Sequence, residues 1–286
     1  MILITGATGT TGRDVVKELE GAGADPVRVL VRDAARAGFA REAGFEAAEG
    51  DFERPETLGP ALEGVERALL LTPPSPRTYE LQRDFIEAAK SAGVRHVVKL
   101  SAIDADPSGP EGFMKWHGQA EEALKSSGLA WTMLQPNFFM QNMLGLASQI
   151  ASMNAIYYPA GDGRASVIDA RDIAAVAAKA LTEEGHEGKT YVLTGPEALS
   201  YHDVAEKLSA VLGRQIAYHP LTPEQFIEGA RAQGLPEWLL GPLGRLNRLY
   251  ASSGAAAVTG DVQRVTGRPA RTFDEFARDY AAAFKG

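Results

Sequence analysis

The stretch that decides the fold is MILITGATGTTGR, residues 1–13. Residues 1–5 form a short apolar run, which is typical of a buried central strand. Gly6, Gly9 and Gly12 follow at three-residue spacing, and an apolar helical pattern opens directly after them. A strand, a glycine turn and a helix in this order predict a dinucleotide-binding turn.

Each glycine of this turn has a physical role in the prediction. Gly6 allows the sharp turn off the strand, Gly9 lets the backbone approach a pyrophosphate, and Gly12 lets the helix pack closely on the strand. The free N–H groups at the helix start then face the phosphates. We assign Thr8, Thr10 and Thr11 to the same site, and the alternative is a glycine-rich turn without a ligand.

Composition limits the class of protein. The chain has 286 residues, of which 45% are hydrophobic and 23% charged, as in soluble globular proteins. Its net charge of -8 argues against nucleic acid or an anionic membrane as the main partner. It has no cysteine, so disulfides and thiolate chemistry are excluded. The first strand begins at residue 1 and leaves no room for a signal peptide, so we expect a cytoplasmic protein.

The order of elements predicts an α/β fold, because strands and helices alternate as they do around a parallel sheet. The expected strands are residues 1–5, 27–31, 45–48, 65–71, 96–100, 131–134 and 190–193, and the later helices are residues 79–92, 201–212, 223–232 and 272–284. A glycine- and proline-rich loop region separates the last two helices. We therefore predict a Rossmann-type, doubly wound parallel sheet with a smaller, mainly helical C-terminal lobe.

We place the domain boundaries where this alternation weakens. The NAD(P)-binding Rossmann domain is predicted to comprise residues 1–135 and 165–195. The smaller, substrate-binding lobe is predicted to comprise residues 136–164 and 196–286.

Cofactor choice is predicted from the end of the second strand, about twenty residues beyond Gly12. A Rossmann protein selects its dinucleotide there, with an acidic side chain for a ribose 2′-hydroxyl or an arginine for a 2′-phosphate. Arg32 comes first and Arg36 lies one helical turn further on. We interpret them as a fork for the 2′-phosphate, which favours NADP(H) over NAD(H). The alternative is a solvated pair beside Asp33.

Two further turns are predicted to touch the cofactor. Asp51 and Phe52 follow the third strand, where the carboxylate can accept from the adenine amine and the ring can lie against adenine. A carboxylate that caps the helix near Pro55 is an equal alternative for Asp51. Thr72 and Pro73 begin a stiff proline-rich loop at the carboxyl end of the fourth strand, the edge where such sheets bind ligands.

The catalytic position lacks a familiar pair. The glycine spacing resembles the TGxxGxxG of short-chain dehydrogenases/reductases, which usually carry a strand-end Ser and a Tyr-x-x-x-Lys on the next helix. Ser101 stands where that serine belongs. No tyrosine in this chain is followed four residues later by lysine, and His117 and Glu121 occupy the two places.

These motifs make the chain resemble the NmrA-like family of atypical short-chain reductases, nearest to bacterial NAD(P)H:quinone oxidoreductases and triphenylmethane reductases. The resemblance covers essentially the whole chain. It implies a Rossmann domain, an NADP(H) site with cofactor contacts at Ser101, Pro136 and Asn137, and a small C-terminal lobe. The further matching segments are Ser127-Gly128-Leu129, Thr132-Met133-Leu134, Pro136-Asn137-Phe138-Phe139, Asn142, Ala160-Gly161-Asp162-Gly163, Asp172-Ile173-Ala174 and residues 184–191.

His117 and Ser101 are our catalytic candidates, and each has two interpretations. The imidazole of His117 either donates a hydrogen bond or proton near the nicotinamide, or bonds to Glu121 one turn on. Ser101 either contacts substrate or makes a strand-end hydrogen bond. We expect Glu121 to be structural.

The missing tyrosine and lysine favour an acceptor that can be reduced without a strong proton donor from the protein, such as a quinone, an azo group or a cationic dye. Residues with aromatic or polar side chains near the expected site are predicted to bind this small aromatic or quinone-like substrate, although such residues are more often core. They are Phe113, Trp116, His117, Phe139 and Asn142. The sequence shows no metal-binding pattern, and we expect a monomer or homodimer. The competing function is a non-catalytic regulator that senses NAD(P)(H).

Overall fold

The computed structural model describes residues 1–285, which divide into two compact units. Unit 1 comprises Met1–Pro136 and Ile173–Val192. Unit 2 comprises Asn137–Asp172 and the described residues from Leu193 onward. Each unit is therefore built from two separate stretches of the chain.

Unit 1 is organised around a seven-stranded sheet with the order β3-β2-β1-β4-β5-β6-β8. Neighbouring strands from β1 to β6 pair in parallel. The order reverses beside β1, and ligands of open α/β sheets bind at the carboxyl edge of such a point. The strands are β1 (Ile2–Ile4), β2 (Val27–Val31), β3 (Glu46–Glu49), β4 (Arg67–Leu70), β5 (His96–Leu100), β6 (Ala130–Pro136) and β8 (Lys189–Leu193).

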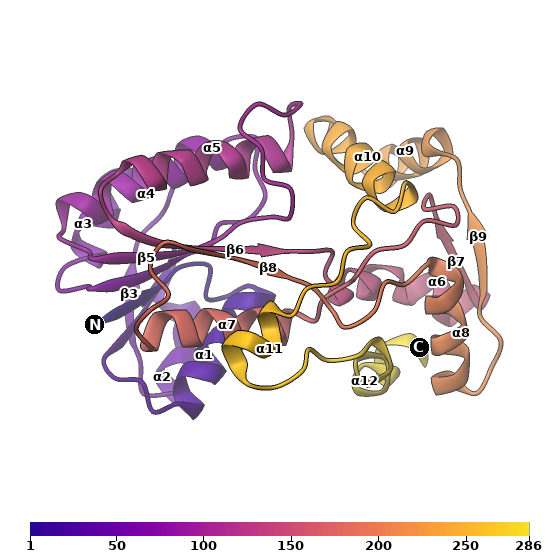
Figure 1. Ribbon diagram of the computed structural model, residues 1–286, viewed down its shortest axis with the longest axis horizontal. Helices are drawn as coiled ribbons and strands as arrows, with labels where there is room; N and C mark the ends of the chain where they lie inside the picture. Colours follow the sequence, from indigo (N-terminus) through magenta and orange to yellow (C-terminus); the bar gives the residue numbers. More distant parts are fainter. Residues whose placement is uncertain (286) are drawn as a thin grey trace. The chain divides into compact units, whose positions relative to one another are not determined.

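Helices cover both faces of this sheet, as Figure 1 shows. On one face lie α1 (Thr10–Gly21), α2 (Gly38–Glu42) and α7 (Ala170–Thr182). On the other lie α3 (Leu58–Ala61), α4 (Thr78–Ser91) and α5 (Phe113–Ser126). Two short 3-10 helices, η1 (Ala34–Ala37) and η2 (Pro55–Thr57), follow β2 and β3. This confirms the predicted doubly wound Rossmann-type fold.

Strand alternation decides which side chains meet each layer of helices. Leu3, Ala68 and Val97 are fully buried and pack in one cluster with Phe85 of α4. Side chains two residues apart on a strand point to the same face. Lys99 of β5 therefore points to the same face as Val97, toward α4 and α5.

Unit 2 is mainly helical, as predicted for the C-terminal lobe. Its strands β7 (Ala155–Tyr158) and β9 (Ala217–Pro220) form a small parallel sheet in which Ala155 lies opposite Ala217. Stacked tyrosines fill its centre, where the ring centroids of Tyr158 and Tyr201 are 4.5 Å apart. Its helices are η3 (Met140–Leu146), α6 (Ala147–Met153), α8 (Tyr201–Leu212), α9 (Pro223–Ala232), α10 (Glu237–Ala251), α11 (Asp261–Thr266), α12 (Phe273–Asp279) and α13 (Ala281–Lys285).

Two expectations for this region were wrong. The loop predicted before the last helix contains α10 and α11, because the burial of Leu240, Pro242 and Tyr250 outweighs the low helix propensity of proline and glycine. The single helix expected at residues 272–284 is two short helices, and α12 ends at a C-cap on Tyr280.

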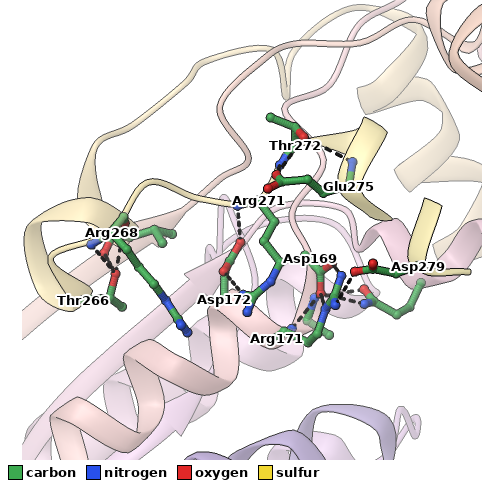
Figure 2. A network of polar contacts seen from close by, with 12 residues as sticks. Asp169, Arg171, Asp172, Thr266, Arg268, Arg271, Thr272, Glu275 and Asp279 are labelled. Atoms are coloured by element: carbon green, nitrogen blue, oxygen red, sulfur yellow. Dashed lines mark hydrogen bonds and ion pairs between the residues drawn. The ribbon is translucent and has the colours of Figure 1, made fainter. Parts of the chain in front are cut away.

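A polar network fixes the start of α7 within unit 2 (Figure 2). Asp169 and Asp172 are fully buried carboxylates. Arg171 binds Asp169 and Asp279, each at 2.6 Å. The backbone N–H of Arg271 donates to Asp172 at 2.7 Å, and the Arg271 guanidinium pairs with the same carboxylate. The Asp172-Ile173-Ala174 motif thus anchors the segment that precedes α12.

Across residues 1–285, the structure contains no helix that is both long and apolar enough to cross a bilayer. The same residues form no group of three or more acidic or histidine side chains that could hold a metal ion.

We predict that Asp172→Ala lowers the free energy of unfolding by about 3–5 kcal/mol, because it leaves the Arg271 cation without its buried partner. Urea unfolding followed by circular dichroism measures this change. The matched control is Glu237→Ala, which removes an exposed partner of Arg231 and should unfold at the wild-type urea concentration. Equal losses in the two variants would contradict a structural role for the buried pair.

Candidate active site

The glycine turn between β1 and α1 is closed by backbone contacts that leave no space for side chains. Gly6 has a φ of +63°, and a Cβ there would lie 2.3 Å from a methyl carbon of Leu71. A Cβ on Gly12 would lie 2.2 Å from the carbonyl oxygen of Gly6. The hydroxyl of Thr5 bonds to backbone atoms of Leu69 and Leu71, which ties the turn to the end of β4.

The N-terminus of α1 is open to a ligand. Its N-cap is Gly9, which offers no side-chain cap, and its first turn carries no acidic residue. Thr8, Gly9 and Thr10 are exposed, whereas Thr11 is buried. First-turn N–H groups have no partner inside a helix, and together with the helix dipole they favour an anion. The turn therefore fits a phosphate group.

The two predicted cofactor arginines follow β2 and are exposed. In the described chain, no hydrogen bond or ion pair engages the guanidinium of Arg32 or Arg36. The competing acid, Asp33, caps η1 with one carboxylate oxygen, which accepts from the Ala35 N–H at 2.9 Å. The basic groups at this edge are thus available to an anion.

The turn after β3 has a strong internal structure. The carboxylate of Asp51 accepts from the Glu53 N–H at 3.1 Å, and its backbone N–H donates to Thr57. The Phe52 ring stacks on Phe85 with centroids 5.5 Å apart. This geometry gives Asp51 a capping role in a turn, and the predicted contacts of Asp51 and Phe52 with adenine stay predictions.

The loop after β4 begins with Thr72, whose hydroxyl accepts from the Gln82 side chain at 2.8 Å. Pro73 is exposed. The hydrogen bond to α4 fixes the start of this loop beside the Gly6 turn, at the carboxyl end of β4.

The most unusual contact of the site joins β5 to α5. The ammonium of Lys99 lies 3.0 Å from Nδ1 of His117. Burial lowers the pKa of Lys99 to about 7, although the nearby Glu121 opposes this shift. Burial and the Lys99 charge lower the pKa of His117 well below its usual value, so the imidazole is neutral at neutral pH.

A second pair joins the same two elements. The Ser101 hydroxyl donates to the Glu121 carboxylate at 2.5 Å, and the Gln135 amide donates to the same oxygen at 2.9 Å. Both Ser101 and Glu121 are buried. Ser101 therefore makes a strand-end hydrogen bond, and Glu121 binds both Ser101 and Gln135; the substrate contact of Ser101 and the structural role of Glu121 stay predictions. His117 takes Lys99 rather than Glu121 as its side-chain partner.

The predicted substrate residues of α5 form an aromatic corner. The rings of Phe113 and Trp116 meet edge to face, with centroids 5.7 Å apart. Trp116 is buried and its indole N–H donates to Glu111, so much of its surface is committed to packing. Phe113 and His117 are partly exposed, which leaves them accessible to a ligand.

The remaining predicted residues flank the end of β6. Pro136 is buried, and its carbonyl accepts from the Ile103 N–H at 3.0 Å. In unit 2 the Asn137 amide is fully engaged, because it donates to Ser166 and Ala255 and accepts from the Phe138 N–H. Phe139 is partly exposed and Asn142 exposed at the start of η3. The predicted ligand contacts of these residues stay predictions.

Lys99 was missed by sequence reasoning, although a signal was present. The strand HVVKL places one cation in an otherwise apolar parallel strand, and such strands are buried on both faces. Lysine is almost never fully buried without a partner, so its presence there predicts a functional or paired group.

Comparisons with known proteins agree with this geometry. A family model described as NAD(P)H-binding matches residues 6–184. The chain is 45% identical to an NAD(P)H azoreductase of Xenophilus azovorans over 99% of each chain. The structure of Escherichia coli NADPH-dependent quinone oxidoreductase QOR2 complexed with NADPH is similar, with a TM-score of 0.91 and 30% identity over 98% of this chain and 100% of that one.

A third relative extends the range of acceptors. The Citrobacter sp. triphenylmethane reductase complexed with NADP(H) has a TM-score of 0.85 and 26% identity, over 97% of this chain and 99% of that one. The resemblance inferred from the sequence motifs, to quinone oxidoreductases and triphenylmethane reductases, is therefore confirmed.

The glycine turn yields a prediction that separates folding from binding. Gly12→Ala should destabilise the fold by about 1–3 kcal/mol, because its methyl group meets the Gly6 carbonyl. Gly9→Ala should cost less stability than Gly12→Ala, because its φ of -80° suits alanine and its Cβ would lie 3.3 Å from the Gly6 carbonyl oxygen, but it should bind NADPH more weakly because the methyl group obstructs a phosphate. Thermal unfolding and calorimetric titration measure the two effects. Gly21→Ala, where a Cβ at the end of α1 meets nothing within 4 Å, should bind NADPH like wild type and be no less stable.

Proposed function

This chain belongs to the NAD(P)H-binding family, and from that premise we propose that it is an NADPH-dependent oxidoreductase that passes hydride to a flat, electron-poor acceptor. The acceptor class is a quinone, an azo compound or a triphenylmethane-type dye. The observation that carries the proposal is the 45% identity to an azoreductase along both full chains. The glycine turn, closed by contacts that only glycine allows, supports it independently.

The residues present fit the cofactor. Gly6, Gly9 and Gly12 leave room for a pyrophosphate against the N-terminus of α1, and Thr8 and Thr10 add exposed hydroxyl groups there. When bound, the reduced nicotinamide supplies the hydride. The fit at the turn applies to either dinucleotide, so the choice between them rests on the end of β2.

The preference for NADP(H) over NAD(H) follows from the free guanidinium groups at that edge. Arg32 and Arg36 offer planar donors that suit a 2′-phosphate. Asp33, the residue that would bind a 2′-hydroxyl, caps η1 with one oxygen. The two free guanidinium groups therefore carry the preference for the phosphorylated cofactor.

The acceptor follows from the side chains near His117. A neutral imidazole whose Nδ1 is occupied by Lys99 can present an Nε2 proton as a hydrogen-bond donor. It supplies a weaker acid than a tyrosine paired with lysine. Acceptors that take hydride readily need mainly proximity and one donor, so this site suits quinones and azo groups more than simple ketones. Phe113 and Trp116 would provide an apolar wall for a flat ring.

We predict that Arg32→Ala weakens NADPH binding by about 1–3 kcal/mol and leaves NADH binding nearly unchanged, because only the 2′-phosphate loses a charged hydrogen bond. Calorimetric titration of both cofactors measures the difference. The matched control is Arg95→Ala, which removes an exposed arginine before β5 and should change neither affinity. Equal wild-type affinities for the two cofactors would refute the preference.

The acceptor class is tested with a panel of quinones, azo dyes and triphenylmethane dyes, together with a simple ketone and a nucleotide sugar. Loss of NADPH absorbance should be well above the buffer rate for at least one flat acceptor and weak or absent for the last two. Tight binding of one redox form of the cofactor without turnover of any acceptor would instead indicate the sensing regulator. Ready epimerisation of the nucleotide sugar would overturn the assignment of the site.

A further inference from the structure

A fully buried lysine in a central strand needs an explanation. Lys99 has no exposed surface, and its ammonium reaches only Nδ1 of His117 at 3.0 Å and the Leu100 carbonyl at 3.5 Å. An ammonium group has three donors, and a buried charge with few partners is costly. Shape alone does not account for this residue, because a methionine would fill a similar volume without the charge.

The surroundings of Lys99 control its charge. Its neighbours across the sheet are the apolar Leu70 of β4 and Met133 of β6. The charged groups that bear on it come from α5, where Glu121 raises its pKa and Lys125 lowers it. The buried side chains of α4 are uncharged, among them Leu81, Gln82 and Phe85. Ser101, next on the same face of β5, is bonded to Glu121.

The contact also fixes the state of the imidazole. Because the Lys99 ammonium can only donate, Nδ1 of His117 must accept, and the single proton of the neutral ring then sits on Nε2. The partial exposure of His117 leaves the ring accessible to a ligand. The pair thus holds two protons that can move. One is on Nε2 of His117, and the other is on the Lys99 ammonium, which donates to Nδ1.

We propose that Lys99 is the proton source for the reduction, acting through His117 as a two-step relay; the proposal rests on the proposed function. Lys99 is a positioning and proton-storing residue that does not touch the acceptor. His117 is the group that does.

The protons and electrons of this step balance. With a quinone or azo acceptor, hydride supplied by the nicotinamide would displace an electron pair onto oxygen or nitrogen, and that pair takes the Nε2 proton of His117; a cationic triphenylmethane dye would take hydride alone and need no proton. Nδ1 takes a proton from Lys99 at the same time, so the histidine changes tautomer and the lysine becomes neutral. After product release, water supplies a proton to Nε2, and the Nδ1 proton returns to Lys99. A solvent path to the buried lysine is therefore unnecessary.

The relay predicts a direction for the pH dependence. The pKa of Lys99 is about 7, so the lysine carries its proton below that pH and loses it above. Turnover of an acceptor at saturating NADPH should therefore fall as the pH rises through about 7. His117 stays neutral throughout, because its own pKa lies well below its usual value.

Lys99→Met tests the relay, because it keeps an unbranched side chain and removes the proton. We expect turnover of the best quinone or azo acceptor to fall on the order of 10²-fold, the fall above neutral pH to disappear, and NADPH affinity to stay unchanged. The matched control is Lys90→Met, which removes an exposed lysine in the last turn of α4 that does not act on Lys99. It should keep the wild-type dependence on pH.

A second measurement does not depend on activity. Nitrogen NMR of histidine-labelled protein should show His117 as the neutral Nε2–H tautomer, with signals that shift near pH 7 in wild type and not in Lys99→Met. If that variant does not fold, the wild-type spectrum and pH profile decide. Turnover that is flat from about pH 6 to pH 8, or an Nδ1–H tautomer, would overturn the relay and leave the reductase standing. If wild type reduces no acceptor, the proposed function falls and the relay with it.

Discussion

The contact between the backbone of Gly12 and the carbonyl oxygen of Gly6 is the constraint on which unit 1 depends. It brings the first turn of α1 down onto the end of β1, at a distance that no side chain tolerates. Thr5 ties the same turn to β4, so a strand, its neighbour and a helix meet at one point. The anion-binding end of the helix is therefore placed by packing between elements, and the fit for a phosphate is a consequence of how the fold closes.

The side-chain contacts of the site follow from two residue spacings that are nearly equal in length, one along a strand and one along a helix. Residue 99 lies in β5 and residue 101 directly follows it, a spacing of two that is about 6.6 Å along an extended chain. Residues 117 and 121 lie four apart on α5, which is about 6 Å along a helix. The two elements can therefore be joined by two contacts side by side, Lys99 with His117 and Ser101 with Glu121. One contact holds a proton that can move, and the other secures the helix against the strand.

The elements that were predicted well have strong local signals. β2 and β5 begin and end at the predicted residues because each is rich in valine and leucine, as buried parallel strands are. α8 and α9 do so as well, and each starts with a capping box, at Ser200 and Thr222. α10 was missed because its stability comes from burial of one face, which the proline and glycines in its sequence conceal.

The backbone of the glycine turn could be predicted from the sequence, whereas the side-chain partners in the site could not. Glycine spacing predicts a turn because the requirement is local. The partner of His117 was left open between a ligand and Glu121, since spacing along one helix says nothing of a strand that packs against it. Lys99 came from a different element, so its contact is a property of the tertiary structure.

The bond between Asp172 and Arg271 has a consequence for synthesis. The two residues are 99 positions apart, so a ribosome makes the buried carboxylate long before its counter-ion. Every residue of unit 1 precedes Arg271, whereas unit 2 cannot pair Asp172 until Arg271 has been made. Domains generally fold as units and in order of emergence. The nucleotide-binding half can therefore be complete on the nascent chain before the other half has its counter-ion.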